Sequence, residues 1–181
     1  MSIPKRFTFI LVISFITLTC YSQTKSNDSI ARDSLFRIYI TYITRLAQNK
    51  DTSIATNYKT KQFDVALFPQ WYFCLSVEGE KSSFNVTKQE ADSSEYALKS
   101  YLKEQPYPIY KKLRKYKRQY FGYLDSNGHK ILFINCFWNK EFNSEWLQQE
   151  IIVCDGGWYY WQIKFDLTTS KFFDFYVNGN A

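Results

Sequence analysis

Residues 150–178, EIIVCDGGWYYWQIKFDLTTSKFFDFYVN, indicate three consecutive β-strands, because β-branched and aromatic runs are separated by short turn-forming segments. Gly156 and Gly157 can adopt the positive φ angles of a two-residue hairpin turn, which would place Cys154 opposite Tyr159. Side chains alternate between the two faces of a strand. The predicted core face therefore carries Ile152, Cys154, Tyr159, Trp161, Ile163, Phe165 and Leu167.

The opposite face of these strands is expected to meet water and carries Trp158, Tyr160, Gln162, Lys164 and Asp166. In the last strand, Phe173, Phe175 and Val177 alternate with Phe172, Asp174, Tyr176 and Asn178. An odd number of loop residues is needed to bring the first of these sets onto the core face. We therefore expect a three-residue loop, 169–171, with a bulge, or a five-residue loop.

The first 22 residues have the pattern of a secretory signal peptide. Lys5 and Arg6 precede an apolar run over 7–18 that is too short to span a bilayer comfortably, and cleavage is expected after Ser22. The mature protein would then be exported, either periplasmic or secreted, with no transmembrane segment. A lipoprotein attached through Cys20 is less favoured, because the residue before such a cysteine is normally Gly or Ala.

Composition sets limits on the chemistry of the chain. The formal charge is +6, and removal of Lys5 and Arg6 leaves about +4, which does not by itself indicate nucleic acid. His129 is the only histidine, and the six glycines form no phosphate-binding motif, so we expect no metal and no cofactor. Cys74, Cys136 and Cys154 lie in apolar runs without paired spacing. They can form one disulfide or be buried as free thiols.

We expect a polar, disordered lead at 23–28 and a single domain at 29–181. Apolar residues at helical spacing predict a helix over 30–48, and a shorter helix is expected over 52–63. Strands are predicted at 71–77 and 83–87. A further helix should begin at Asp92 or Ser93 and end near Gln105, before Pro106.

Residues 110–125 end in a strand, and Asn127-Gly128 predicts a two-residue turn into a second strand over 130–138. This turn would pair Leu124 with Ile131 and Tyr120 with Asn135. Apolar side chains occur on both faces of the hairpin. The hairpin should therefore be central in its sheet and covered on both sides.

Helices followed by antiparallel strands indicate an α+β fold, with N-terminal helices packed on a curved antiparallel sheet. By analogy of element order, this is a cystatin-like or NTF2-like cone. Residues 116–123, Asp155-Gly156-Gly157 and the ending 173–181 resemble uncharacterised exported Bacteroidota proteins over roughly the last third of the chain. This resemblance implies export, and it carries over no catalytic or binding role.

Two sets of residues are candidate binding sites. The first is a basic run without acidic residues, interleaved with tyrosines, that would attract phosphates, acidic polysaccharide or lipid head groups. It consists of Lys111, Lys112, Arg114, Lys115, Lys117 and Arg118. The alternative interpretation is a solvated helix face or a charged sheet edge that protects against aggregation.

The second set is aromatic and lies on the outer face of the predicted sheet, where rings beside charges can stack on sugars. It consists of Trp158, Tyr160, Lys164 and Tyr176. The alternative is a face covered by a loop or by a second subunit.

From these sites we predict an exported, non-enzymatic binding module for an acidic glycan, a lipid head group or a protein. One alternative is an NTF2-like domain that binds or converts a small molecule, which would need a deep apolar pocket with a buried carboxylate. Another is a cystatin-like inhibitor or interaction protein, which would need protruding hairpin tips at Asn127-Gly128 and Gly156-Gly157.

Overall fold

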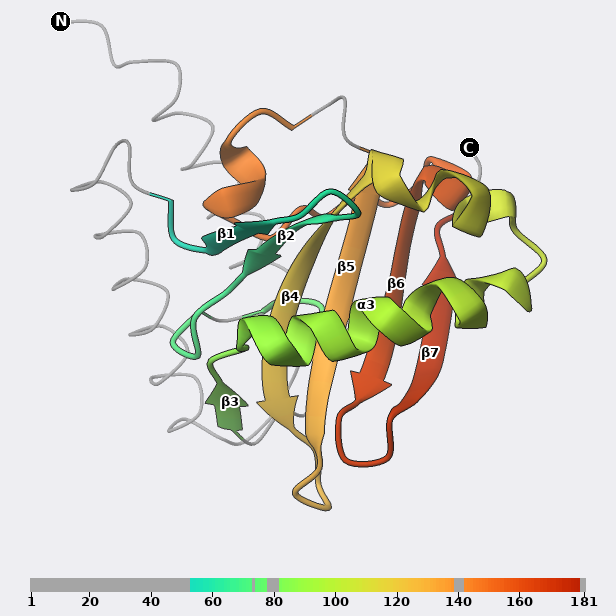
Figure 1. Cartoon of the computed structure of the whole chain (residues 1–181). Helices are drawn as coiled ribbons and strands as arrows, with labels where there is room; N and C mark the ends of the chain where they lie inside the picture. Colours follow the sequence, from blue (N-terminus) through green and yellow to red (C-terminus); the bar gives the residue numbers. More distant parts are fainter. Residues whose placement is uncertain (1–52, 73, 78–81, 139–141, 180–181) are drawn as a thin grey trace, which may run out of the picture. The chain divides into compact units, whose positions relative to one another are not determined.

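The computed structural model describes residues 53–72, 74–77, 82–138 and 142–179 (Figure 1). The predicted signal peptide, the lead at 23–28 and the helix over 30–48 lie outside the described residues. Among the residues that are described, no helix is long and apolar enough to cross a membrane.

The fold is α+β, with a curved, mostly antiparallel sheet of seven strands, as the class prediction stated. The strands are β1 (Thr56–Lys59), β2 (Asp64–Leu67), β3 (Ser82–Phe84), β4 (Tyr116–Leu124), β5 (Lys130–Trp138), β6 (Tyr160–Asp166) and β7 (Lys171–Val177). Their order is β1-β2-β4-β5-β6-β7, with β3 also paired to β4. Among the strand pairs of the described residues, only β2–β4 is parallel.

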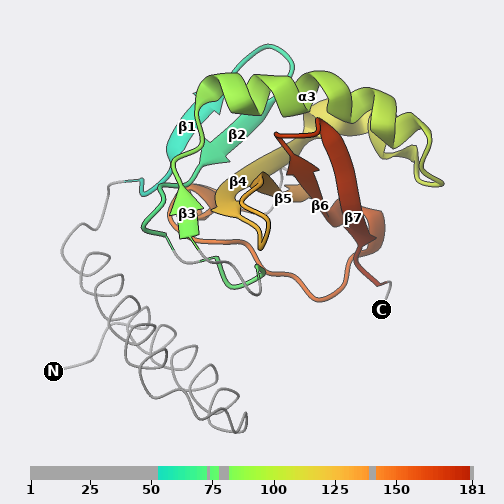
Figure 2. The ribbon, with the colours of Figure 1, turned by 90° about the horizontal axis from the view of Figure 1, so that it is seen from below.

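One described α-helix, α3 (Lys88–Lys103), crosses one face of this sheet (Figures 1 and 2). It begins before the expected Asp92 or Ser93, because Thr87 is the N-cap and forms a capping box with Glu90. A buried stripe along the helix then packs on the sheet through Ala91, Ser94, Leu98 and Leu102.

The prediction of a helix over 52–63 was wrong, since β1 and β2 form a hairpin there. The Thr60 hydroxyl accepts hydrogen bonds from the N–H groups of Gln62 and Phe63 and so builds the turn between the two strands. The predicted strand over 71–77 was also wrong, because its described residues form turns. Their backbone N–H groups at Leu75 and Ser76 bind the Glu150 carboxylate instead of a neighbouring strand.

The hairpin of β4 and β5 is central and buried on both faces, as predicted, but its predicted register was wrong by one residue. Leu124 pairs with Lys130, and Tyr120 pairs with Ile134. The Asp125 side chain accepts the N–H groups of Asn127 and His129, which closes a three-residue loop instead of a two-residue turn. Because of this shift, Tyr120 and Ile134 share the face that α3 covers.

The stretch Glu150–Asp155, predicted to be a strand, is not one. It belongs to the segment between β5 and β6, which covers the sheet face opposite α3 (Figure 2). Gln119 donates hydrogen bonds from this face to the carbonyl groups of Trp146 and Gln149, and Asn135 donates one to that of Ile151. Side-chain amides of the sheet thus satisfy backbone groups that strand pairing would otherwise satisfy.

Gly156 and Gly157 do not form the predicted hairpin, because a 3₁₀ turn, η3 (Gly157–Tyr159), begins there. Ile152, Cys154 and Tyr159 are consequently exposed. Trp161, Ile163 and Phe165 are buried in the core, and this part of the prediction is confirmed.

The odd-length loop predicted before the last strand was wrong as well. Asp166 pairs with Lys171 across a loop of four residues, and the register shifts later, near Asp174, whose φ is +49°. This irregularity within β7 lets Phe172 and Phe175 both pack against Tyr101 of α3. The apolar side chains reach the core through a bulge in the strand, not through the loop.

Candidate anion-binding surface

Three segments that are distant in sequence meet at one end of the sheet. They are the 3₁₀ segment η1 (Pro108–Lys115), the end of β5 and η3. The basic–aromatic cluster that they form consists of Lys112, Lys115, Trp138, Trp158 and Tyr159. The Lys112 ammonium group lies 5.2 Å from the ring centre of Trp158 and 5.9 Å from that of Trp138. Lys115 lies 5.6 Å from the ring centre of Trp138.

The sequence of η1 explains why its charges face solvent. Pro108 begins the segment with a favourable φ, and Ile109 is fully buried. Leu113 packs against the core from the same segment. With its apolar side chains turned inward, η1 leaves its basic residues, Lys111, Lys112, Arg114 and Lys115, exposed.

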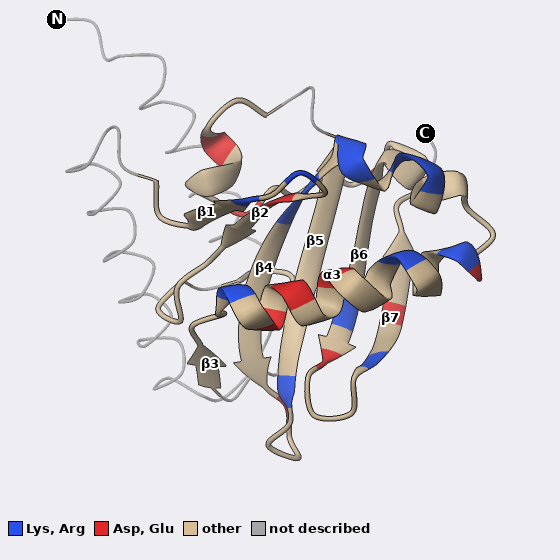
Figure 3. Ribbon diagram, in the orientation of Figure 1, with Lys and Arg blue, Asp and Glu red and all other residues tan. Residues whose placement is uncertain are grey.

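These four cations form a concentrated positive surface. Within the described residues none of them pairs with a carboxylate. Figure 3 shows η1 with blue positions and no red ones. An anion that approaches η1 therefore meets positive charge that no carboxylate of the described residues neutralises.

The turn that presents Trp158 depends on two glycines. Gly156 has a φ of +91°, and an added Cβ would lie 2.5 Å from the Tyr160 ring. Gly157 has a φ of +58°, and its N–H donates to the carbonyl of Gly179 at 3.0 Å. Their conformational freedom is required here, because other residues adopt positive φ only with strain.

Hydrogen bonds from β4 and from the C-terminal residues also fix this turn. The Tyr116 hydroxyl donates to the Trp158 carbonyl at 2.9 Å. Asn178 donates to the carbonyl groups of Val153 and Asp155. The ring of Trp158 thus extends from a backbone that the core and the C-terminal residues hold in place.

The aromatic rings of the cluster mainly contact one another and the lysines. Trp158 and Tyr159 stack with ring centres 4.3 Å apart, and Trp138 meets both rings edge to face. Tyr159 is 40% exposed, whereas Trp138 and Trp158 are half-buried. This arrangement holds ammonium groups in place, and one ring face each of Trp158 and Tyr159 is used in their own stacking contact.

The rest of the predicted basic run does not join this surface. Arg118 is fully buried and pairs with Glu95 at 3.2 Å, so it does not lie on this surface. Lys117 lies on the other face of β4, with its ammonium group 4.2 Å from the ring centre of Trp146. Burial lowers the pKa of Lys117.

The predicted outer aromatic face is not one site either. Trp158 lies in η3 and joins the basic–aromatic cluster, while Tyr160 packs beside Gly156. Lys164 pairs with Asp174 at 2.9 Å. Tyr176, on β7, is 58% exposed.

Sequence reasoning missed Trp138 and Tyr159 as members of the cluster. Tyr159 was assigned to the core because the Gly-Gly hairpin was assumed, and Trp138 was treated only as the end of a strand. Their only sequence signal was aromatic character next to a strand end.

Among the described residues, Cys74, Cys136 and Cys154 are free thiols; the first two are buried and Cys154 is exposed. No group of metal-ligating side chains occurs among the described residues.

A separate groove of about 270 Å³ opens near the sheet edge at β2. It is lined by Ile54, Thr56, Leu67, Phe68, Pro69, Asn85, Val86 and Lys88. No carboxylate lines this groove.

Comparisons of the chain with protein-family models, curated proteins and solved structures gave no match. The proposals below therefore rest on the geometry of this chain alone.

Proposed function

We propose that the protein is an exported, non-enzymatic binding module that recognises an acidic glycan through η1 and the basic–aromatic cluster. The observation that carries this proposal is the set of four exposed cations on η1, none of which pairs with a carboxylate in the described part of the chain. Two of them lie over tryptophan rings. Sulfate and carboxylate groups on a polysaccharide supply the matching negative charges.

The tryptophan rings make these lysines better anion ligands than free surface lysines. A lysine side chain carries about 2 kcal/mol of rotamer entropy, which is lost when a ligand fixes it. An exposed cation–π contact contributes about 0.5–1 kcal/mol. Contacts with Trp138 and Trp158 therefore offset part of this cost before the ligand arrives.

The same geometry favours a glycan over nucleic acid or a membrane. Single-stranded nucleic acid is bound by stacking bases on free ring faces. Here the rings of Trp158 and Tyr159 stack on each other. Insertion into a membrane uses apolar side chains that enter the lipid, whereas Trp138 and Trp158 are half-buried. Charge recognition of sulfate or carboxylate groups needs only the exposed ammonium and guanidinium groups.

The alternatives have less support. The Gly156-Gly157 hairpin tip that a cystatin-like inhibitor would use is replaced by η3, which is bonded to Gly179. A catalytic NTF2-like domain would use a pocket with a carboxylate, and none lines the groove near β2. We keep the cystatin-like or NTF2-like cone as a hypothesis for the fold alone, supported by α3 lying across a curved sheet.

The test is the affinity of the mature chain, residues 23–181, for dextran sulfate, with neutral dextran as the reference, measured by titration calorimetry. The double variant Lys112→Gln/Lys115→Gln should weaken binding about tenfold, equivalent to about 1.4 kcal/mol. The control Lys99→Gln/Lys103→Gln removes the same charge from exposed positions on α3. It should change the affinity much less.

Equal losses in the two double variants would mean that net charge alone attracts the polymer. Absence of binding to dextran sulfate would contradict the proposal. Raising the salt concentration should weaken binding, because exposed charges are screened beyond about 8 Å at physiological ionic strength. If anionic phosphatidylglycerol vesicles or single-stranded DNA bind more tightly than dextran sulfate, the ligand of this surface is a lipid head group or a nucleic acid, and not a glycan.

A further inference from the structure

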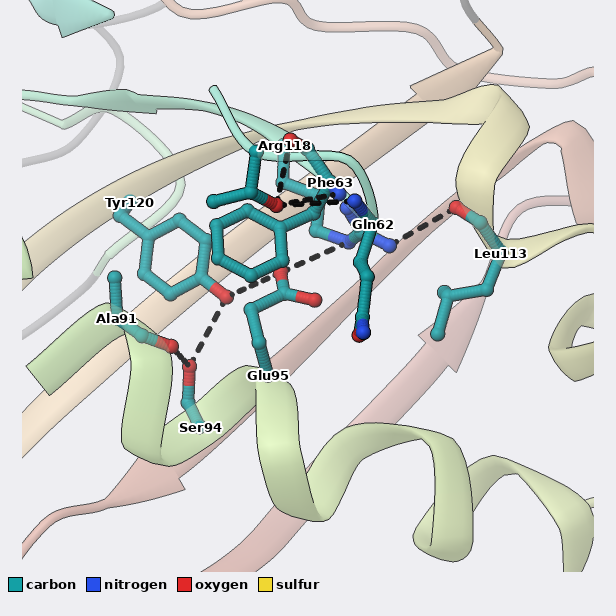
Figure 4. A network of polar contacts seen from close by, with 9 residues as sticks. Gln62, Phe63, Ala91, Ser94, Glu95, Leu113, Arg118 and Tyr120 are labelled. Carbon is teal, nitrogen blue, oxygen red and sulfur yellow. Dashed lines mark hydrogen bonds and ion pairs between the residues drawn. The ribbon is translucent and has the colours of Figure 1, made fainter. Parts of the chain in front are cut away.

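A buried polar cluster lies beneath η1, and the proposed anion site does not use it directly (Figure 4). Its centre is the ion pair of Arg118 on β4 and Glu95 on α3, with side chains 0% and 6% exposed. Arg118 Nη2 also donates a hydrogen bond of 2.9 Å to the carbonyl oxygen of Leu113, in η1. One guanidinium group thus contacts both α3 and η1.

The cluster continues from Glu95 along α3 and the sheet. The Tyr120 hydroxyl donates to Glu95 Oε1 at 2.8 Å and lies 3.0 Å from the Ser94 hydroxyl. Ser94 in turn donates to the carbonyl of Ala91. Burial raises the pKa of Glu95, while the charge of Arg118 and the Tyr120 hydroxyl act in the opposite direction.

The bond to Leu113 matters because η1 is not one continuous helix. It is a 3₁₀ segment that is interrupted at Lys112, where φ is −122° and ψ is 18°. The Leu113 carbonyl accepts both Arg118 Nη2 and the N–H of Tyr116. Fixing this carbonyl fixes the backbone next to Lys112 and two residues before Lys115.

The geometry of the ion pair leaves part of the guanidinium group without hydrogen bonds in the described part of the chain, so it does not give the greatest possible stability. Arg118 Nε and Nη1 make no hydrogen bond to any described residue, although Nε lies 3.2 Å from Glu95. A buried ion pair often contributes little net stability, because both charges lose their hydration. The main effect of the ion pair is therefore to hold η1 in position, and not to stabilise the fold.

We infer that Arg118 is a positioning residue for the anion site: held by Glu95, it orients η1 and with it Lys112 and Lys115, without touching the ligand. This inference rests on the proposed function. It also requires arginine in particular, because a planar guanidinium can contact Glu95 and the Leu113 carbonyl at once. A lysine ammonium has neither the reach nor the fork geometry.

The test is Arg118→Lys, which keeps the positive charge opposite Glu95. Affinity for dextran sulfate should fall about tenfold, equivalent to about 1.4 kcal/mol. Hydrogen exchange should become faster at the amides of 109–116 and remain unchanged in β5 and β6. The matched control is Ser94→Ala, which removes a polar group from the same buried cluster whose hydrogen bonds go to Ala91 and Tyr120. It should alter neither the affinity nor the exchange of η1.

Wild-type affinity together with unchanged exchange of η1 in Arg118→Lys would overturn the inference. If the wild type does not bind dextran sulfate, the proposed function fails, while the exchange of η1 still shows whether Arg118 orders that segment. If Arg118→Lys does not fold, the isosteric Glu95→Gln tests the other half of the pair. It keeps the guanidinium group and removes the charge that holds it, so it should also lower the affinity and speed exchange at 109–116. Dextran sulfate should also slow exchange at 113–116 in the wild type, and no slowing there would count against the inference.

Discussion

Two halves of one basic run have opposite environments. Residues 111–115 expose four cations on η1, whereas in the next three residues Arg118 is fully buried and Lys117 lies against Trp146. The difference arises at Tyr116, where the chain changes from a 3₁₀ segment to β4. From there side chains alternate between the faces of a sheet that is covered on both sides. Positive charge in sequence therefore becomes an exposed surface only where the backbone keeps it on one solvent-facing side.

The largest expected difference is between Arg118→Met and Arg114→Met. Loss of Arg118 leaves Glu95 buried without its partner, which should reduce the free energy of unfolding by about 3–5 kcal/mol. Arg114 is exposed, so its replacement should change stability by less than about 0.5 kcal/mol. Urea denaturation measures the free energy of unfolding of both variants. Similar losses would mean that Arg118 and Arg114 do not differ in burial as the structure shows.

The second comparison is between two glycines with positive φ. Gly128→Ala should cost about 1–2 kcal/mol, since the φ of +80° is the only strain and no atom is near. Gly156→Ala adds a clash with the Tyr160 ring and should cost roughly 1–3 kcal/mol more. Thermal unfolding gives the difference. Equal costs would show that Tyr160 moves aside and that the turn before Trp158 is not tightly packed.

A smaller effect tests where α3 begins, and therefore how Glu95 is placed opposite Arg118. Thr87→Ala removes the capping box and should cost about 1 kcal/mol. Ser93→Ala changes the residue that the sequence suggested as a cap, but that lies inside the helix. It should leave the free energy of unfolding nearly unchanged. A larger loss of stability in Ser93→Ala than in Thr87→Ala would indicate that Ser93, and not Thr87, caps the helix.

The last comparison sets the loss of stability against the loss of affinity in Lys112→Gln/Lys115→Gln. The cation–π contacts of these exposed lysines contribute about 0.5–1 kcal/mol each at most. Urea denaturation should therefore show a small loss of stability, while the affinity for dextran sulfate falls strongly. A loss of several kcal/mol would show that the cluster maintains the fold and would weaken the case for a binding surface.

Much of the sheet was predictable from local pattern. The four long strands at 116–124, 130–138, 160–166 and 171–177 follow from β-branched and aromatic runs bounded by turn residues. Pairing register was not predictable, because one additional loop residue exchanges the two faces of a strand. In the β4–β5 hairpin the additional loop residue is Ser126, because Asp125 pairs with His129 and its side chain caps the longer loop. In β7 the bulge near Asp174 changes which side chains face the core.

The candidate site was predictable only in part. The exposed lysines and Trp158 were identified, but in separate sites, because the sequence pattern placed Trp158 on the face of a strand. The strand predicted at 150–155 failed for a related reason. Its alternating apolar residues are also compatible with a covering segment whose backbone is bound by Gln119 and Asn135.

The sequence by itself determined the α+β class, the positions of the long strands and the concentration of positive charge at 111–118. These depend on short-range properties such as side-chain shape, turn residues and charge. Only the tertiary structure decided that Lys112 and Lys115 meet Trp138 and Trp158, and that Arg118 is buried beneath them against Glu95. Those contacts join residues far apart in the chain, so they depend on strand register and on the position of α3 across the sheet, which no local pattern specifies.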